Sequence, residues 1–118
     1  MKPLYTVAFT KSFLDQASAD GLGQSEMDAV VNILASKPDA GDLIVGSGGC
    51  RKLRIGRSGG GKSGGFRVVT YFAPRDMPVY AIAVLAKNTR ANFSATEIKA
   101  MKLLASRILS ANPLRSPR

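Results

Sequence analysis

The chain of 118 residues contains no histidine and no tryptophan, and its single cysteine is Cys50. Without histidine it cannot form a Ser-His-Asp triad, a Cys–His pair or a histidine acid–base pair, and most zinc sites are excluded as well. One cysteine cannot form an internal disulfide, which suits a reducing cytoplasm. No apolar run approaches the roughly 20 residues of a membrane helix, and the N-terminus lacks a signal-peptide core. We therefore expect a soluble cytoplasmic protein with no membrane partner.

Acidic residues are also scarce, with 8 of them against 17 lysines and arginines, which gives a formal net charge of +9. Such an excess is typical of proteins that bind polyphosphates, and nucleic acid is the leading partner class. Six cations fall within a short stretch: Arg51, Lys52, Arg54, Arg57, Lys62 and Arg67. The clustering favours a binding surface. The alternative is that Lys52 and Arg54 form the solvated face of an edge strand, where charge deters aggregation.

The segment from Gly56 to Ser63 reads GRSGGGKS and matches the phosphate-binding pattern G-x-x-x-x-G-K-[ST] in every position. In a nucleotide-binding enzyme this loop opens a helix, and a magnesium-holding Asp ends another apolar strand. Here the loop is followed by a β-branched and aromatic run, Phe66 to Phe72, which is typical of a strand. The other apolar run, Val79 to Ala86, is followed by Lys87-Asn88 and not by Asp. We interpret the motif as a cationic hairpin loop and expect no nucleotide cofactor.

Hydrophobic patterning predicts one α+β domain over residues 1–112, followed by a flexible basic tail over residues 113–118. The expected strands cover residues 5–9, 50–55, 66–73 and 79–86. The expected helices cover residues 10–19, 25–37 and 94–112, with N-cap spacing at Ser12, Ser25 and Ser94. The order is β-α-α-β-β-β-α. We expect an antiparallel four-stranded sheet whose N-terminal helical hairpin and C-terminal helix cover one face.

Three segments carry a family resemblance: Arg51-Lys52-Leu53-Arg54, GRSGGGKSGGFRVVTYF from Gly56 to Phe72, and AKNTRANFSATE from Ala86 to Glu97. Together they resemble the HigB-like branch of the RelE/ParE superfamily of bacterial toxins, and the similarity covers nearly the whole chain. It implies a RelE-like fold. It also implies a ribosome-dependent endoribonuclease that cleaves translated mRNA in the 30S A site without cofactor or metal. A cognate helix-turn-helix antitoxin would neutralise it.

By position in the family's motifs, four residues are expected to be catalytic: Lys52, Arg54, Arg67 and Lys87. Attack by the 2′-hydroxyl on the scissile phosphate needs a base, stabilisation of the extra negative charge and an acid for the leaving 5′-oxygen. Lysines and arginines can serve all three roles. We expect Arg67 to contact the scissile phosphate, and we expect a lysine, Lys52 or Lys62, to be a better base than Arg54 because guanidinium stays protonated.

RNA binding is expected at five further positions: Arg51, Arg57, Lys62, Arg90 and Phe93. The best-known ribosome-dependent members of the family carry a tyrosine near the C-terminus that stacks on a base, whereas this chain has no tyrosine after Tyr80. Phe93 could stack on a base but cannot transfer a proton. The acid–base assignment therefore rests on the cations.

Two other functions stay open on the sequence. A ParE-like toxin would inhibit DNA gyrase without nuclease activity, although that branch usually lacks a basic strand and loop as rich as this one. A non-catalytic RNA-binding module would show salt-dependent RNA affinity and no effect on growth.

Overall fold

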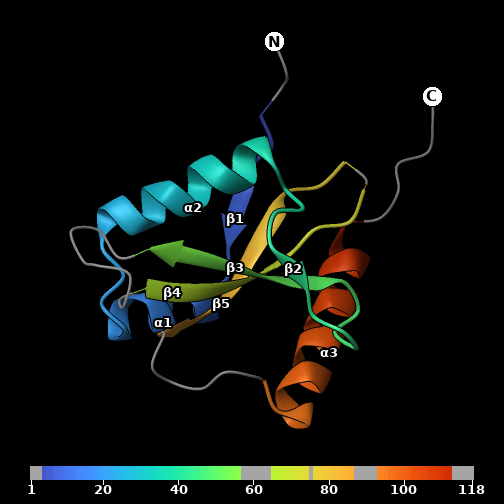
Figure 1. Ribbon diagram of the computed structural model, residues 1–118. Helices are drawn as coiled ribbons and strands as arrows, with labels where there is room; N and C mark the ends of the chain where they lie inside the picture. Colours follow the sequence, from blue (N-terminus) through green and yellow to red (C-terminus); the bar gives the residue numbers. More distant parts are fainter. Residues whose placement is uncertain (1–3, 57–64, 75, 87–92, 113–118) are drawn as a thin grey trace.

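The computed structural model describes residues 4–56, 65–74, 76–86 and 93–112 of the chain (Figure 1). Five strands and three helices follow one another in these residues. They are β1 (Val7–Phe9), α1 (Lys11–Ala19), α2 (Gln24–Ser36), β2 (Asp42–Leu43), β3 (Cys50–Gly56), β4 (Gly65–Tyr71), β5 (Val79–Ala86) and α3 (Ala95–Ala111). The basic tail expected over residues 113–118 lies outside the described residues. The α+β class is confirmed.

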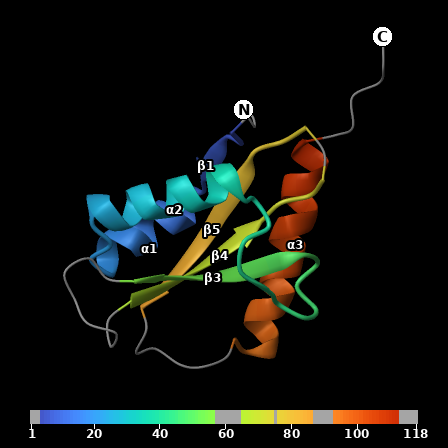
Figure 2. The same ribbon diagram turned by 45° about the horizontal axis from the view of Figure 1, so that its top comes forward.

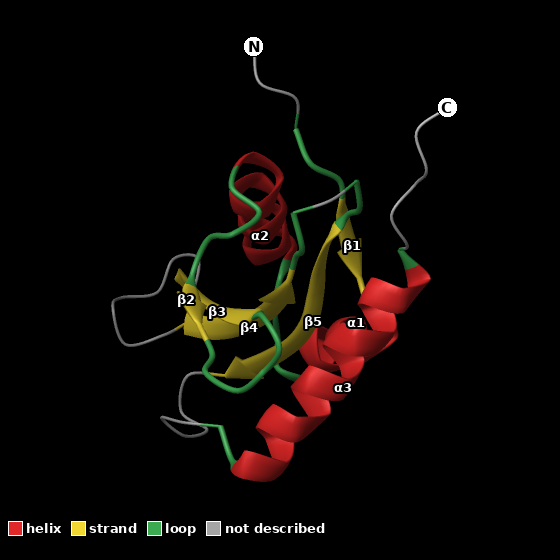
Figure 3. Cartoon of the chain, turned by 90° about the vertical axis from the view of Figure 1, so that its right-hand side faces the viewer, coloured by secondary structure: helices red, strands yellow, loops and turns green. Residues whose placement is uncertain are grey.

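The five strands form one sheet in the order β1-β5-β4-β3-β2, with β1 parallel to β5 and the other pairs antiparallel (Figure 3). The prediction of four antiparallel strands was wrong in two respects. It missed β2, because a strand of two residues is too short to show an alternating pattern. It also made the sheet wholly antiparallel. The pattern within β1 does not reveal that this strand pairs with β5, where Val7 lies opposite Val79, far away in sequence.

Helices cover both faces of the sheet, whereas the sequence predicted helices on one face only (Figure 2). The strand residues buried under α1 and α2 project from one face of the sheet and include Leu53, Ile55, Phe66 and Val68. Those buried under α3 project from the opposite face and include Cys50, Val69 and Tyr71. Because successive side chains of a strand point to opposite faces, the two clusters are two cores separated by the sheet.

Each helix begins at an identifiable cap. The Thr10 Oγ1 accepts a hydrogen bond of 3.1 Å from the Phe13 N–H, so α1 is capped by Thr10 and the expected cap Ser12 lies inside the helix. At α2 the Gly23 N–H donates to Glu26 Oε1 at 2.8 Å, and Ser25 is likewise inside the helix. The expected capping box of α3 is confirmed, because Ser94 and Glu97 bond each other reciprocally at 2.7 and 3.1 Å.

Helix α1 also closes part of the outer edge of β5, where the short β1 no longer pairs. The Thr10 N–H donates to the Ala81 carbonyl at 3.1 Å, and the Thr10 hydroxyl donates to the Ile82 carbonyl at 3.2 Å. Further along, Gln16 Oε1 accepts a bond of 2.8 Å from the Val84 N–H. These contacts satisfy backbone groups that an open edge would leave for other chains. In this sheet β4 is the central strand, with β5 on one side and β3 on the other.

Candidate active site

Three of the predicted cations lie on one face of the β3–β4 ladder. Arg54 is the direct cross-strand partner of Arg67, and Lys52 is the partner of Val69. Directly paired residues project to the same side of a sheet, and so do residues two apart on one strand. Lys52, Arg54 and Arg67 therefore share the face on which α3 lies, and we call these three residues the cationic cluster.

The cationic cluster occupies the end of this face that α3 leaves open. At the other end, Cys50 and Tyr71 are a cross-strand pair buried beneath α3. Arg54 is exposed, and Lys52 and Arg67 are half-buried. Within β4, Arg67 is the one residue that is not fully buried. The polar groups of the cluster can thus reach solvent or a ligand, while the strands that carry them are held by a core on each face.

A pocket of about 310 Å³ lies at the cationic cluster, lined by all three cations together with Gly41, Asp42 and Leu53. Asp42 is the strand partner of Lys52 across β2 and β3, which puts its carboxylate beside a cation that a phosphate would also attract. Sequence reasoning missed Asp42, because it missed β2. Gly41, the residue before it, has φ +94°, and an added Cβ there would lie 2.5 Å from the Lys52 carbonyl oxygen. Only glycine permits this close approach.

Arg54 and Arg67 place two like charges directly opposite each other on neighbouring strands. Like charges directly opposite each other on a sheet are destabilising by up to about 1 kcal/mol. Two guanidinium groups side by side can, however, present several N–H donors to the oxygens of a single phosphate. The paired arginines therefore favour a state in which an anionic ligand is bound over the free protein.

Arg51 lies on the opposite face from the cationic cluster. It pairs with Thr70 and Leu43, and it shares its pleat parity with the buried residues Leu53 and Ile55. Its Nη1 donates to the Gly41 carbonyl at 3.0 Å. The structure thus separates Arg51 from Lys52 and Arg54, although the three are near neighbours in sequence.

The other predicted site residues are less fully described. Phe93 is half-buried and packs against the core beneath α3, in a groove that it shares with Leu85 and Met101. Four predicted residues lie outside the described part of the chain: Arg57, Lys62, Lys87 and Arg90. The sequence predicts a strand, not a helix, after the GRSGGGKS motif. The structure confirms this, because the segment that follows is strand β4.

Cys50 has no nucleophilic character at neutral pH. It is fully buried, and burial raises the pKa of its thiol from an ordinary 9.0 to about 11, although a hydrogen bond from Ser47 acts in the opposite direction. Within residues 4–56, 65–74, 76–86 and 93–112, no group of three or more Cys, Asp or Glu side chains could hold a metal ion. No helix among those same residues is long and apolar enough to cross a bilayer.

Comparison with known proteins identifies the family of this chain. Residues 5–115 match the family model described as the RelE toxin of the RelE/RelB toxin–antitoxin system. The chain belongs to the RelE toxin family. Its fold is also similar to that of a RelE toxin from E. coli, solved in the free state with two arginines replaced by alanine. That match has a TM-score of 0.56 and 20% sequence identity, and covers 90% of this chain and 99% of the other. Membership of the family implies an antitoxin partner.

Proposed function

We propose that this RelE-family toxin is a metal-independent endoribonuclease that cleaves translated mRNA on the ribosome. Toxins of the RelE family are ribonucleases in general, which supports the proposal. The observation that carries it is the direct pairing of Arg54 with Arg67, with Lys52 on the same open face. A cluster of cations on a rigid pair of strands suits a ligand whose charge is concentrated on phosphate oxygens.

In the proposed reaction the 2′-oxygen of the nucleotide attacks the adjacent phosphorus. The new O–P bond forms as the bond to the 5′-oxygen breaks, leaving a 2′,3′-cyclic phosphate and a 5′-hydroxyl. Arg54 and Arg67 stabilise the extra negative charge of the pentavalent intermediate. Lys52, acting as the neutral amine, is the proposed acceptor of the 2′-hydroxyl proton, and protonated Lys87 is the proposed donor to the leaving 5′-oxygen.

The cellular setting of the proposal follows from the resemblance in the sequence. We assign the toxin to the HigB-like branch and place its action in the 30S A site, in the cytoplasm. The partner would be a helix-turn-helix antitoxin encoded beside the toxin gene. Its acidic segments would complement the net charge of +9.

The proposal is tested in a purified translation system with a defined mRNA. The parent toxin should produce cuts at regular codon positions, and only while ribosomes translate the message. Replacing Arg67 with alanine should lower the cleavage rate about 10² to 10³-fold, the loss typical of removing one donor to a developing oxyanion. The matched control is Arg107→Ala, at an exposed position on α3, which should cleave at the parent rate.

Two results would overturn the proposal. One is inhibition of gyrase supercoiling while the mRNA stays intact, which would assign the chain to the gyrase inhibitors. The other is cleavage that Arg67→Ala and Arg107→Ala reduce equally, which would remove the cationic cluster from the chemistry.

A further inference from the structure

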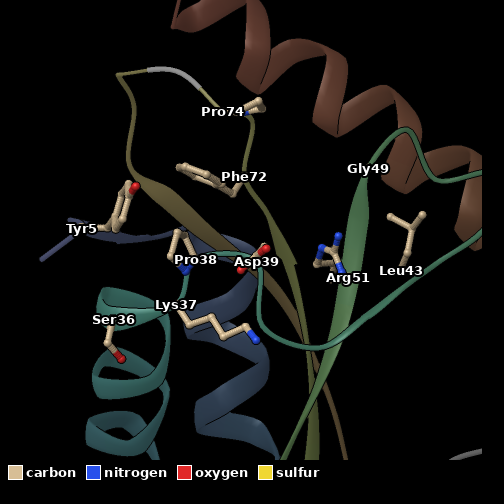
Figure 4. Close-up of a pocket in the computed structure, with 10 residues that line it drawn as sticks. All are labelled: Tyr5, Ser36, Lys37, Pro38, Asp39, Leu43, Gly49, Arg51, Phe72 and Pro74. Atoms are coloured by element: carbon tan, nitrogen blue, oxygen red, sulfur yellow. The ribbon is translucent and has the colours of Figure 1, made fainter. Parts of the chain in front are cut away.

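Arg51, which the cationic cluster does not include, lines a groove on the other side of the sheet (Figure 4). The groove encloses about 930 Å³ and is open to solvent on one side. Figure 4 shows that its walls come from the segment before β1, the end of α2 and the loop after it, β2 with the start of β3, and the loop after β4. The N-terminal segment, residues 36–51 and the loop after β4 thus form one surface.

The walls of this groove are fixed by described contacts. The Tyr5 N–H donates to the Ala35 carbonyl at 2.8 Å, which ties the N-terminal segment to the last turn of α2. The Tyr5 ring meets the Phe72 ring edge to face, with centroids 5.3 Å apart and planes at 82°. Arg51 is held by its bond to the Gly41 carbonyl. A groove with walls fixed in this way needs little ordering when a ligand enters, which favours affinity.

Large apolar side chains that remain exposed gather at the groove. Tyr5 is 44% exposed and Leu43 is 55% exposed, and both line it. The ring of Phe72, which meets that of Tyr5, lines the groove as well. Exposed apolar side chains with charged residues beside them mark protein–protein contacts more often than nucleic-acid contacts.

Three charged residues line the same groove: Lys37, Asp39 and Arg51. Lys37 follows the last residue of α2, and Arg51 approaches from β3. The net charge of the lining is therefore positive, in a chain of net charge +9. An occupant with apolar side chains and carboxylates would match both the aromatic wall and the two cations.

We propose that this groove, which we call the Arg51 groove, is where the antitoxin docks, through an extended segment that carries both apolar and acidic residues. The proposal rests on the antitoxin partner that the family implies and does not depend on the cleavage chemistry. RNA fits the groove poorly, because Asp39 and a largely apolar wall would repel or fail to bind phosphates. Docking there leaves the cationic cluster on the far face of the sheet uncovered by this contact.

The test measures binding by isothermal titration calorimetry, with the purified toxin and the purified product of the reading frame adjacent to its gene. Arg51→Glu should weaken binding roughly tenfold or more, because it sets a carboxylate against the acidic segment. Leu43→Asp, at an exposed position where folding is not at risk, should do the same. The matched control is Lys99→Glu, an equal charge reversal at an exposed position of α3 outside the groove, which should bind within about twofold of the parent.

The Asp39→Asn variant tests whether the segment that occupies the groove is acidic or basic. It should leave binding unchanged or strengthen it, because it removes a carboxylate that an acidic segment would avoid. Weaker binding from Asp39→Asn together with unchanged binding from Arg51→Glu would mean a basic occupant and would overturn the proposal. So would unchanged binding from both Arg51→Glu and Leu43→Asp, or a tenfold loss confined to Arg54→Glu on the far face.

A growth assay separates this proposal from the proposed function. Expressed alone, the Leu43→Asp toxin should still arrest growth, because Leu43 lies outside the cationic cluster, and co-expression of the antitoxin should no longer rescue the cells. If the antitoxin no longer rescues the cells but their mRNA stays intact, the groove proposal is supported and the nuclease proposal is rejected. Full rescue of cells that express an active Leu43→Asp toxin would reject the groove proposal and leave the nuclease proposal standing.

Discussion

The two ends of the β3–β4 ladder differ, on the same face of the sheet, in whether a helix covers them. Cys50 and Tyr71 form a cross-strand pair at one end, beneath α3, and both are buried. Arg54 and Arg67 form the equivalent pair at the open end, four residues after Cys50 in β3 and four residues before Tyr71 in β4. At both ends β3 and β4 pair residue for residue in the same antiparallel register. Coverage by α3 therefore decides which end is core and which end can hold a charged ligand.

The largest effect is expected from a charge introduced at the covered end. Val69, opposite Lys52 where the covered part of the face begins, is fully buried beneath α3, and Val69→Lys would bury an ammonium group without a partner beside another cation. The cost should be several kcal/mol, enough to leave the protein largely unfolded. Thermal unfolding followed by circular dichroism measures it. The matched control is Val45→Lys, at 85% exposure, which should change stability by about 0.5 kcal/mol or less. Equal melting temperatures for the two variants would contradict the comparison.

A smaller effect at the covered end depends on pH. Burial keeps the Cys50 pKa near 11 in the folded protein, against 9.0 for an ordinary thiol. The folded state therefore favours the neutral thiol, whose stabilising contribution is complete below pH 9 and is lost as pH rises toward 11. The loss should amount to about 2 to 3 kcal/mol.

Denaturant titration of the parent and of Cys50→Ala between pH 8 and pH 11 isolates this contribution from the titration of lysines and tyrosines, which both proteins share. The stability advantage of the parent should narrow by that amount as the pH rises. A constant difference across the range would show that the thiol is not held in its neutral form by burial.

The smallest effect is expected at the open end. Arg54→Leu removes one of two like charges that face each other, so the free energy of unfolding should rise by about 0.2 to 1 kcal/mol. The same variant should lower the slope of log affinity for single-stranded RNA against log salt by about 0.7, the value for one phosphate contact. Arg107→Leu is the matched control and should change neither quantity. A lower stability for Arg54→Leu would mean that Arg54 has a structural role.

Much of the fold could be predicted from the sequence, because local pattern governs most of it. β3, β4, β5 and α3 lie within two residues of their expected limits, and Ser94 caps α3 as expected. The placement of α3 on the far face could not be obtained from its own apolar stripe, which fits either face. The run from Phe66 to Tyr71 carried the missing signal, because a strand with consecutive apolar residues is typical of a sheet buried on both faces.

The candidate site was predictable to the extent that strand alternation determines it. Alternation placed Lys52 and Arg54 on one face, and the register adds Arg67 to that face and sets it opposite Arg54. Asp42 was not predictable, because β2 exists only through its pairing with β3. The sequence analysis grouped Arg51 with Lys52 and Arg54 because the three are close in sequence. In the structure, strand alternation places Arg51 on the other face of the sheet, in the Arg51 groove.

The most direct test of the central claim is a double-mutant cycle on cleavage by the toxin, with Arg54→Ala, Arg67→Ala and the double variant in the same translation assay. If the two arginines hold one phosphate as a unit, the double variant should be only slightly less active than the less active of the two single variants. Losses that multiply in full would show two independent contacts, as expected for sites that do not share a partner. That result would contradict a single phosphate site at the open end of the ladder.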